Sequence, residues 1–372
     1  MINPDLKYQI ALGLIKGVGP IVAKNLVGYF GDVRKIFAAK AADLARVPGV
    51  GRVLIKSLRE GDVMARAEEE LKFIERYGIR PMFFTDSDYP VRLANCDDGP
   101  TMLYVKGDVE LNAAKVLSVV GTRRPTERGK EQCEQMIAEL SARHPDLLVV
   151  SGLAYGIDVC AHRQSLRSGV PTVGVVAHGL DRVYPSLHRD VAAQMVRSGG
   201  GMVTEFMSGT RPEAQNFVKR NRIIAGLADV LLVVESDVDG GSLITAKAAF
   251  EYNRDVVAIP GSPADEMSRG CNYLIKRDVA RLVESAADIE AVAGWDIADA
   301  TRASEPVQES LPLEMSDEER KIYTVLLAER EMQLGALSVR CEMPIGKINS
   351  TLLSLELMGV VKMLPGNACR IV

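Results

Sequence analysis

The chain has 372 residues, of which 47% are hydrophobic and 25% are charged, so the sequence predicts a globular protein with two or three domains. A formal net charge of −4 excludes a polycation that coats nucleic acid, and any nucleic-acid site must be a local basic patch. The longest apolar runs are too short to span a bilayer, and the N-terminal sequence lacks the pattern of a signal peptide.

Six cysteines are scattered along the sequence, and none belongs to a Cys-x-x-Cys pair. This spacing favours neither a zinc site nor a disulfide framework, and it fits the reducing environment of the cytoplasm. We therefore expect a cytoplasmic protein, with no membrane contact, that needs no metal and no cofactor.

Residues 1–65 are expected to form a helical helix-hairpin-helix, or SAM-like, domain. Two glycine-containing turns, Lys16–Pro20 and Pro48–Arg52, each lie between stretches of helical apolar periodicity. Glycine permits a tight turn, and Pro20 suits the first position of the following helix. The N–H groups at such a helix start can hold a phosphate, with a dipole contribution of roughly 0.3–1 kcal/mol. A packing corner without a ligand explains the pattern equally well, so both interpretations stay open.

Residues 66–297 alternate between apolar runs and helical stretches. The runs that we expect to be buried parallel strands are Lys115–Val120, Leu147–Val150, Thr172–Val176, Met202–Thr204, Val230–Val234 and Val256–Ile259. The helices expected between them include Glu127–Ala142, Asp190–Arg197 and Leu243–Tyr252. This order predicts an α/β fold with a Rossmann-like, doubly wound parallel sheet.

Residues 298–314 have the polar composition of a linker, and residues 315–372 are expected to form a small winged-helix domain. Ser316 and Glu319 have the spacing of a capping box at the start of its first helix. Pro344 is expected to open the third helix, and the turn Pro365–Asn367 is expected to join two short strands.

In an open parallel sheet, ligands bind where loops leave the carboxyl ends of the strands, and three loops place notable residues at that edge. The first loop, Gly121–Thr126, contains Arg123 and Arg124 and precedes a helix that Thr126 can cap. Because arginine can donate two parallel hydrogen bonds to a phosphate, this loop is a candidate anion site. A solvated charged turn is the alternative.

The second loop, Ser151–Asp158, has glycines that leave backbone amides open to a phosphate. It matches neither the dinucleotide-binding pattern nor the P-loop pattern. Asp158 and His162 lie one helical turn apart, and a structural hydrogen bond between them is favoured over a catalytic pair. The segment Gly240–Thr245 follows another strand and offers a helix start that either faces a phosphate or packs against the sheet.

The third loop places Lys219, Arg220 and Arg222 within four residues, next to Phe217. Cations bind phosphates, and an aromatic ring offers a face on which an unpaired base stacks, with a contribution of about 1–3 kcal/mol per base. On an acidic chain, such a run favours a site for single-stranded nucleic acid over a helix start with solvated basic residues.

A series of short motifs follows in the order GTRRPT (121–126), SGLAYGID (151–158), GLDRVYP (179–185), TEF (204–206), KRNRIIAGL (219–227), GSLITA (241–246) and RGCNYLI (269–275). Upstream of them stand Asp88–Pro90 and Leu103–Gly107. In order and spacing, these segments resemble the DprA/Smf family of DNA-processing proteins over most of the chain. Each motif alone is weak, but the combination is specific.

The resemblance implies a protein that binds and protects single-stranded DNA, forms a homodimer through its Rossmann-like domain and promotes loading of the RecA recombinase. Such proteins serve natural transformation and recombination, and the family is not known as an enzyme class. We expect Arg123, Lys219 and Arg222 to bind phosphates and Phe217 to stack on a base. The full set of DNA-binding residues carried over by motif is Arg123, Arg124, Ser151, Gly152, Phe217, Lys219, Arg220 and Arg222.

Two positions depart from the family pattern. Tyr155 stands where many members carry lysine or arginine, which either weakens a phosphate contact or replaces it by stacking. The presumed recognition helix of the winged-helix domain, Pro344–Met358, has Lys347 as its only cation. Because duplex binding usually draws on several cations, a protein contact or a weak auxiliary role is favoured for this domain.

Two other functions compete with DNA binding. The Rossmann-like core and Glu205 also resemble nucleotide phosphoribohydrolases, which cleave the base from a nucleotide. Those enzymes carry a Pro-Gly-Gly-x-Gly-Thr loop, which Gly240–Leu243 approximates only loosely. The second possibility is a protein that acts chiefly as an adaptor, with incidental DNA contact.

Overall fold

The computed structural model describes residues 3–60, 63–295, 315–329, 331–364 and 368–371. The chain divides into two compact units, Met1–Trp295 and Asp296–Val372. The linker expected over 298–314 and the turn expected at Pro365–Asn367 lie outside the described residues.

The first unit begins with the helical region that the sequence predicted. Its helices are α1 (Leu6–Leu14), α2 (Pro20–Phe30), α3 (Val33–Ala38), α4 (Ala41–Leu44) and α5 (Arg52–Glu60). The predicted turns join α1 to α2 and α4 to α5, with Gly17 and Gly49 at φ of +93° and +84°. Pro20 occupies the first turn of α2, as predicted. A Cβ on Gly17 would lie 3.2 Å from Leu54, so the first turn packs against the second hairpin.

A mixed sheet follows α6 (Val63–Tyr77), and the boundary expected at residue 65 falls within this helix. Among the described residues the strand order is β1-β2-β6-β5-β4-β3-β7-β8-β9. The strands are β1 (Arg80–Phe83), β2 (Met102–Lys106), β3 (Lys115–Val120), β4 (Leu147–Ser151), β5 (Thr172–Val175), β6 (Gly201–Thr204), β7 (Val230–Val233), β8 (Asp255–Ala258) and β9 (Arg281–Leu282). The six predicted strands correspond to β3–β8, whereas β1, β2 and β9 were not predicted.

The sheet is doubly wound, as predicted. The chain builds β3 to β6 in one direction, then returns and builds β7 to β9 on the other side of β3. These strands are all parallel, whereas β2 pairs antiparallel with both β1 and β6. Leu117 of β3 pairs with Val149 of β4 and with Val230 of β7. The point where the strand order reverses therefore lies between β3 and β7.

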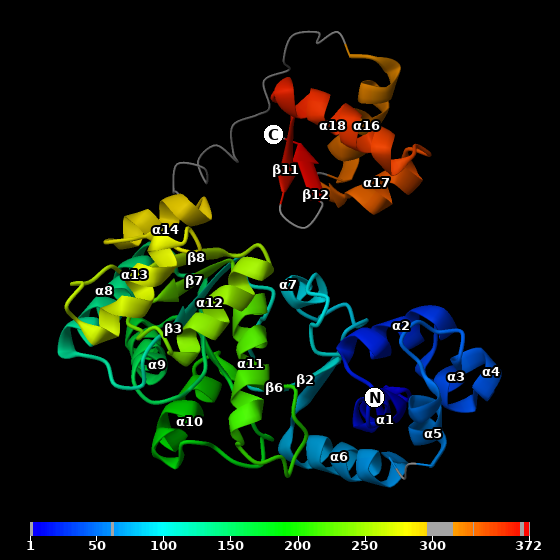
Figure 1. The fold of residues 1–372 in the computed structure, drawn as a ribbon, viewed down its shortest axis with the longest axis horizontal. Helices are drawn as coiled ribbons and strands as arrows, with labels where there is room; N and C mark the ends of the chain where they lie inside the picture. The colour runs from blue at the N-terminus through cyan, green and yellow to red at the C-terminus, as the bar shows by residue number, and fades with distance from the viewer. Residues whose placement is uncertain (1–2, 61–62, 296–314, 330, 365–367, 372) are drawn as a thin grey trace. The chain divides into compact units, whose positions relative to one another are not determined.

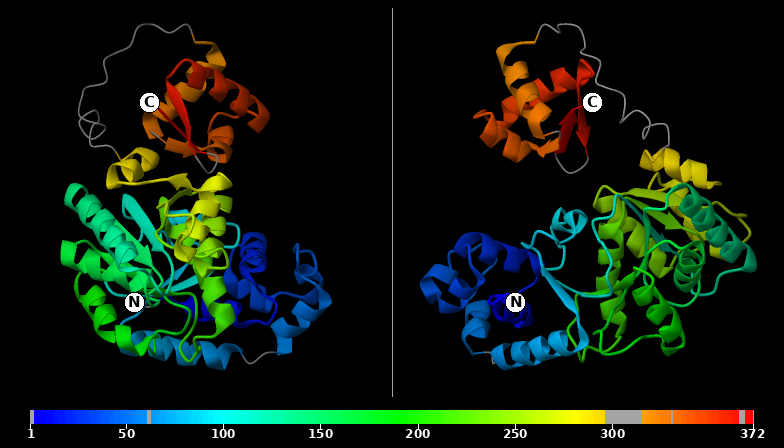
Figure 2. Two further views of the ribbon diagram at one scale, coloured as in Figure 1. Left: turned by 60° about the vertical axis from the view of Figure 1, so that its left-hand side comes forward. Right: turned by 180° about the vertical axis from the view of Figure 1, so that it is seen from behind.

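Helices cover both faces of the sheet (Figure 1, and from other sides in Figure 2). One layer contains α8 (Glu127–Arg143), α9 (Ile157–Ser168), α10 (Arg189–Arg197) and α14 (Ala286–Ala293). The opposite layer contains α11 (Ala214–Leu227), α12 (Gly241–Glu251) and α13 (Arg269–Lys276), and the short α7 (Val91–Ala94) packs against α11. Alternate residues of β3 serve the two cores: Leu117 and Val119 face α8, and Val116 and Val120 face α11.

The second unit is a winged-helix domain, as predicted. Its elements are α16 (Asp317–Glu329), β10 (Glu331–Gln333), α17 (Leu334–Arg340), α18 (Ile345–Leu357), β11 (Val361–Leu364) and β12 (Ala368–Ile371). The predicted capping box is present: the N–H of Glu319 donates to Ser316 Oγ (3.3 Å), and the N–H of Ser316 donates to Glu319 Oε2 (2.8 Å). Strand β10, which pairs with β12, was not predicted.

All six cysteines are buried and free. Within the described part of the chain, none of the helices combines the length and the apolar character needed to cross a bilayer.

Candidate functional site

A cavity of about 570 Å³ lies at the carboxyl ends of β3, β4 and β7, where the winding of the sheet reverses. We call it the switch-point cavity. This is the place where open α/β sheets bind their ligands. Its lining comes from the ends of β3, β4 and β7 and the loops after them, from one side of α11 and from the start of α12: Val120–Arg124, Ala154, Asp158, Ala214, Phe217, Val218, Arg220, Asn221, Ile224, Ser236, Asp237, Gly240–Ser242, Ile244 and Thr245.

Two exposed arginines from the first predicted loop stand at this cavity, Arg123 and Arg124. The guanidinium carbon of Arg123 lies 5.7 Å from the ring centroid of Phe217, and that of Arg220 lies 5.8 Å from it. These distances are those of cation–π contacts. The structure therefore brings Arg123, Arg124, Phe217 and Arg220 together around one hollow, although they are far apart in the sequence.

The side chain of Arg220 is held by backbone carbonyl groups at the carboxyl edge of the sheet. Its side chain is buried, and Nη1 donates to the carbonyl oxygens of Gly152 (2.6 Å) and Val175. Burial lowers the pKa of Arg220 to about 10, while the nearby carboxylate of Asp158 opposes that shift. Arg220 thus adds positive charge to the cavity, and its two hydrogen bonds also hold the backbone at the ends of β4 and β5.

Two other predicted residues, Ser151 and Gly152 at the end of β4, present no side chain to the solvent. Ser151 is fully buried, and its hydroxyl donates to the carbonyl oxygen of Val119 (2.7 Å). A Cβ on Gly152 would lie 2.6 Å from Arg220 Nη1 and 2.6 Å from Asp158 Oδ2. Position 152 requires glycine because two buried charged side chains, those of Arg220 and Asp158, fill the space that a Cβ would occupy.

The predicted Asp158–His162 hydrogen bond was wrong. His162 turns toward β5, where its Nδ1 lies 2.7 Å from Thr172 Oγ1, and Asp158 instead accepts from the N–H of Ala154 (3.2 Å). Burial lowers the pKa of His162 to about 3, so the ring is neutral at physiological pH. Burial also raises the pKa of Asp158, against the attraction of Arg220.

Among the described residues, four helices begin at or beside the cavity, and their N-termini differ in what they already hold. Helix α11 begins at Ala214, and the acidic Glu213 is its N-cap residue. At α8, the carboxylate of Glu235 accepts from the N–H (2.8 Å) and the hydroxyl (2.6 Å) of Thr126, the predicted cap. At α9, Asp158 accepts from a backbone N–H near the helix start. Helix α12 begins with glycines at 240 and 241, and its first turn lines the cavity. The start of α12 therefore offers its N–H groups to an anion in the cavity.

Arg222 lies on a different side of α11 from the cavity. It forms an ion pair with Glu205, in which both side chains are about one-sixth exposed, at 16% and 17%. Burial raises the pKa of Glu205, while Arg222 and the charge of Lys219 lower it. Lys219 is exposed. The structure therefore separates Lys219 and Arg222 from the group formed by Arg123 and Phe217.

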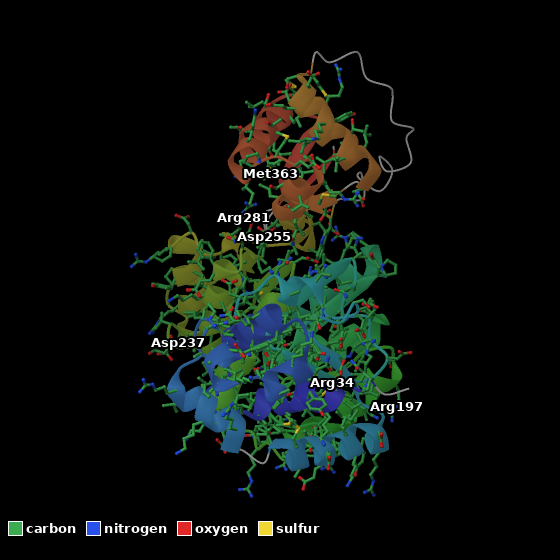
Figure 3. All side chains as sticks on the ribbon, turned by 90° about the vertical axis from the view of Figure 1, so that its right-hand side faces the viewer. Arg34, Arg197, Asp237, Asp255, Arg281 and Met363 are labelled. Carbon is green, nitrogen blue, oxygen red and sulfur yellow. The ribbon has the colours of Figure 1, made fainter. Side chains whose placement is uncertain are left out.

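The sequence reasoning missed two acidic residues of this region. Glu235 directly follows β7 and is buried at the start of α8, and Asp237 stands two residues further on at the surface of the unit (Figure 3). The rule that ligand sites lie at the carboxyl ends of parallel strands could have identified both, because they follow the apolar run at 230–234. With Asp158, Asp237 partly offsets the three guanidiniums of the cavity.

The chain combines a helix-hairpin-helix region, a Rossmann-like sheet with a cationic and aromatic switch-point cavity, and a winged-helix domain, and its matches give the class as recombination mediators. Residues 80–293 match the family described as DNA recombination-mediator protein A, residues 302–367 match the DprA winged helix domain and residues 11–61 match the SAM-like helix-hairpin-helix tandem. Since the first match covers more than half of the chain, the chain belongs to the DprA/Smf family.

Individual relatives agree with this family. The chain is 29% identical to the protein Smf of Synechocystis over 98% of each chain. The solved structure of DNA processing protein A from Streptococcus pneumoniae is 32% identical, with a TM-score of 0.63 over 77% of this chain and 97% of that one. The same protein from Helicobacter pylori, whose structure addresses its single-stranded-DNA binding mode, is 25% identical, with a TM-score of 0.53 over 59% of this chain and 97% of that one.

Proposed function

We propose that the chain binds single-stranded DNA in the switch-point cavity, with Arg123, Arg124 and the start of α12 on phosphates and Phe217 against a base. The observation that carries this proposal is the meeting of exposed guanidiniums, an aromatic ring and an open helix start around one cavity. The binding mode addressed for the H. pylori relative supports it. Stacking is tolerant of sequence, so little preference among bases is expected.

The other predicted residues take different parts in this proposal. Arg220 and Gly152 shape the floor of the cavity, and Ser151 supports β4 from within the core. Lys219 is exposed on α11 and attracts the backbone of a strand that passes the cavity. Arg222 is already paired with Glu205, so we assign it a structural part.

The test is a titration of labelled oligo(dT) across salt concentrations with wild type, Arg123→Ala and Arg128→Ala. Arg128 is the matched control, because it is an exposed arginine, the second residue of α8, that is not part of the cavity lining. The logarithm of the affinity should fall with the logarithm of the salt concentration by about 0.7 for each phosphate neutralised. Arg123→Ala should weaken binding and reduce the slope by about that amount, and Arg128→Ala should change neither. A flat salt response in the wild type would contradict the proposal.

We further propose that the bound strand is handed to RecA and that the chain acts in the cytoplasm during recombination or natural transformation. A homodimer is part of this proposal, and exposed apolar side chains near the β8–β9 edge, Phe250 and Leu282, support a self-contact there. Mass measurement in solution tests the dimer. Assembly of RecA on single-stranded DNA, timed with and without the chain, tests the transfer, and equal rates would contradict it.

Binding without turnover is favoured over nucleotide hydrolysis. Glu205, the acid that a phosphoribohydrolase would need, is paired with Arg222 and borders a separate cavity of about 120 Å³ rather than the switch-point cavity. Incubation with AMP or CMP should therefore release no free base. Release of base that Glu205→Gln abolishes would replace the binding proposal by an enzymatic one.

A further inference from the structure

Two tyrosines stand half-exposed beside the switch-point cavity but outside its lining. Tyr155, on the loop after β4, is 43% exposed, and Tyr184, on the loop after β5, is 46% exposed. Other aromatic side chains of the described residues are as exposed, but these two stand on neighbouring loops at the edge of the sheet that holds the cavity. Large exposed apolar groups that cluster mark binding surfaces.

Both rings are fixed by packing rather than free to rotate in solvent. The centroid of the Tyr184 ring lies 5.9 Å from that of Phe217, with an angle of 54° between the ring planes. The Tyr155 ring meets the buried ring of His188 edge to face at 5.1 Å, and His188 is bonded to the carbonyl oxygen of Leu153 (2.9 Å). Rings that are already oriented lose little conformational entropy when a flat ligand stacks on them.

The rings continue the cavity in one direction. Phe217 belongs to the cavity lining and also contacts Tyr184, so the aromatic surface runs without a break from the cavity to the loop after β5. Because the strands lie in the order β5-β4-β3, the loops that carry Tyr184, Tyr155 and Arg123 follow one another along the same edge of the sheet. A strand held at Arg123 would pass over both tyrosines if it left the cavity on the β4 side.

We propose that Tyr155 and Tyr184 form a second, base-stacking subsite for single-stranded DNA, which guides the strand out of the switch-point cavity over the loops after β4 and β5. The subsite rests on the proposed function of that cavity. In this subsite the ring of Tyr155 provides a stacking face on the loop after β4.

Nucleic acid fits this surface better than a protein partner does. Just after the loop that follows β5, Leu187 is 75% exposed, but the ring of Tyr184 lies between the exposed cations Arg182, which pairs with Asp181, and Arg189 in the sequence. Aromatic rings beside cations match a chain of bases and phosphates. A protein partner would not need an aromatic surface that continues into a cationic cavity, whereas a nucleic-acid strand would.

The experiment compares the wild type with Tyr155→Ala/Tyr184→Ala, with Tyr155→Phe/Tyr184→Phe and with Tyr77→Ala. Tyr77 is the matched control, since it is 48% exposed at the end of α6, away from the cavity. Affinities for oligo(dT) are measured at a fixed salt concentration, and thermal unfolding verifies the fold of each variant. The alanine pair should lose roughly 5- to 150-fold in affinity for each ring that stacks, which corresponds to about 1–3 kcal/mol per base. The phenylalanine pair and Tyr77→Ala should bind like the wild type.

The possible outcomes separate this subsite from the proposed function. If the alanine pair binds like the wild type while Arg123→Ala loses affinity, the cavity binds DNA but the subsite is refuted. If the wild type itself does not bind oligo(dT), the proposed function fails first. If the alanine pair keeps its DNA affinity but loses self-association, the tyrosines form a protein interface and the inference is wrong. Photo-crosslinking of 5-iodouracil-containing strands to peptides that contain Tyr155 or Tyr184 would give direct support.

Discussion

Replacement of Gly152 by alanine should destabilise the first unit strongly, although it adds only a methyl group. The added carbon would lie 2.6 Å from both Arg220 Nη1 and Asp158 Oδ2. Ends of flexible side chains usually move aside cheaply, but both groups here are buried, at 4% and 8% exposure, and Arg220 is pinned by two carbonyl oxygens. Any movement therefore breaks hydrogen bonds of a buried charge.

The magnitude follows from three contributions. Overpacking of a tight site costs about 1–3 kcal/mol. Loss of one hydrogen bond to a charged group costs about 1.5–3 kcal/mol more. The alanine also restricts the unfolded chain, which offsets about 0.4–1 kcal/mol. The net decrease in the free energy of unfolding is therefore expected to be about 2–5 kcal/mol.

The single tryptophan provides a selective assay. Trp295 is buried at the end of the first unit, near the ring of His144, so urea unfolding followed by its fluorescence reports on this unit and not on the winged-helix domain. Gly28→Ala is the matched control: Gly28 is exposed inside α2, and a Cβ there meets no atom of the described residues within 4 Å. This control should gain about 0.5–1 kcal/mol. A Gly152→Ala variant as stable as the wild type would refute the close packing of Arg220 and Asp158 around Gly152.

Two further predictions concern buried charge. Because His162 has a pKa of about 3 in the folded state and about 6.5 when unfolded, the unfolded chain binds the extra proton between these values. Through this group, the free energy of unfolding should thus fall by up to about 1.4 kcal/mol as the pH drops from about 6 to about 5. His162→Gln should make this dependence on pH shallower. If urea titrations give the same dependence of the free energy of unfolding on pH for both proteins, the prediction is contradicted. Arg222→Met should lower the free energy of unfolding by about 1–3 kcal/mol, which is less than the loss expected for a fully buried ion pair, and should change the affinity for oligo(dT) by no more than about twofold. A large loss of affinity in a folded variant would show that Arg222 belongs to the DNA site.

The central fold was predictable because its strands are continuous apolar runs separated by amphipathic helices. The run Lys115–Val120 coincides with β3, and the ends of β4–β8 differ by one residue or less. The sequence did not indicate β1 and β2, because both join the sheet by antiparallel pairing, β2 with β6 and β1 with β2, rather than by a helical crossover. The two-residue β9 and the three-residue β10 are too short to leave a periodic signal.

The sequence predicted that the cation-bearing loops share one edge of the sheet, and the switch-point cavity lies at that edge, but the sequence did not predict which side chains line it. Loop composition placed cations at the right edge of the sheet, yet it gave no means to tell Arg220, Arg222 and Lys219 apart. Their separation depends on the angle of each residue around α11: Arg220 faces the sheet, Arg222 faces Glu205 and Lys219 faces solvent. To predict which way each side chain of α11 points, one must know what packs against each face of the helix. The partner of Arg222 is Glu205, which lies 17 residues earlier in the chain.

The distribution of charge at the cavity suggests how a mildly acidic protein can hold a polyanion. Three of the four helix N-termini around the cavity already carry an acidic side chain, Glu235 at α8, Asp158 at α9 and Glu213 at α11, and the charge of Arg220 is partly offset by Asp158. Within the lining, the attraction available to phosphate is therefore concentrated at Arg123, Arg124 and the start of α12, and the exposed Lys219 lies outside the lining. In the proposed complex, the cations of the lining would neutralise only a small number of phosphates, and stacking on the exposed rings would supply the remainder of the affinity. The exposed aromatic side chains beside the cavity are consistent with that requirement.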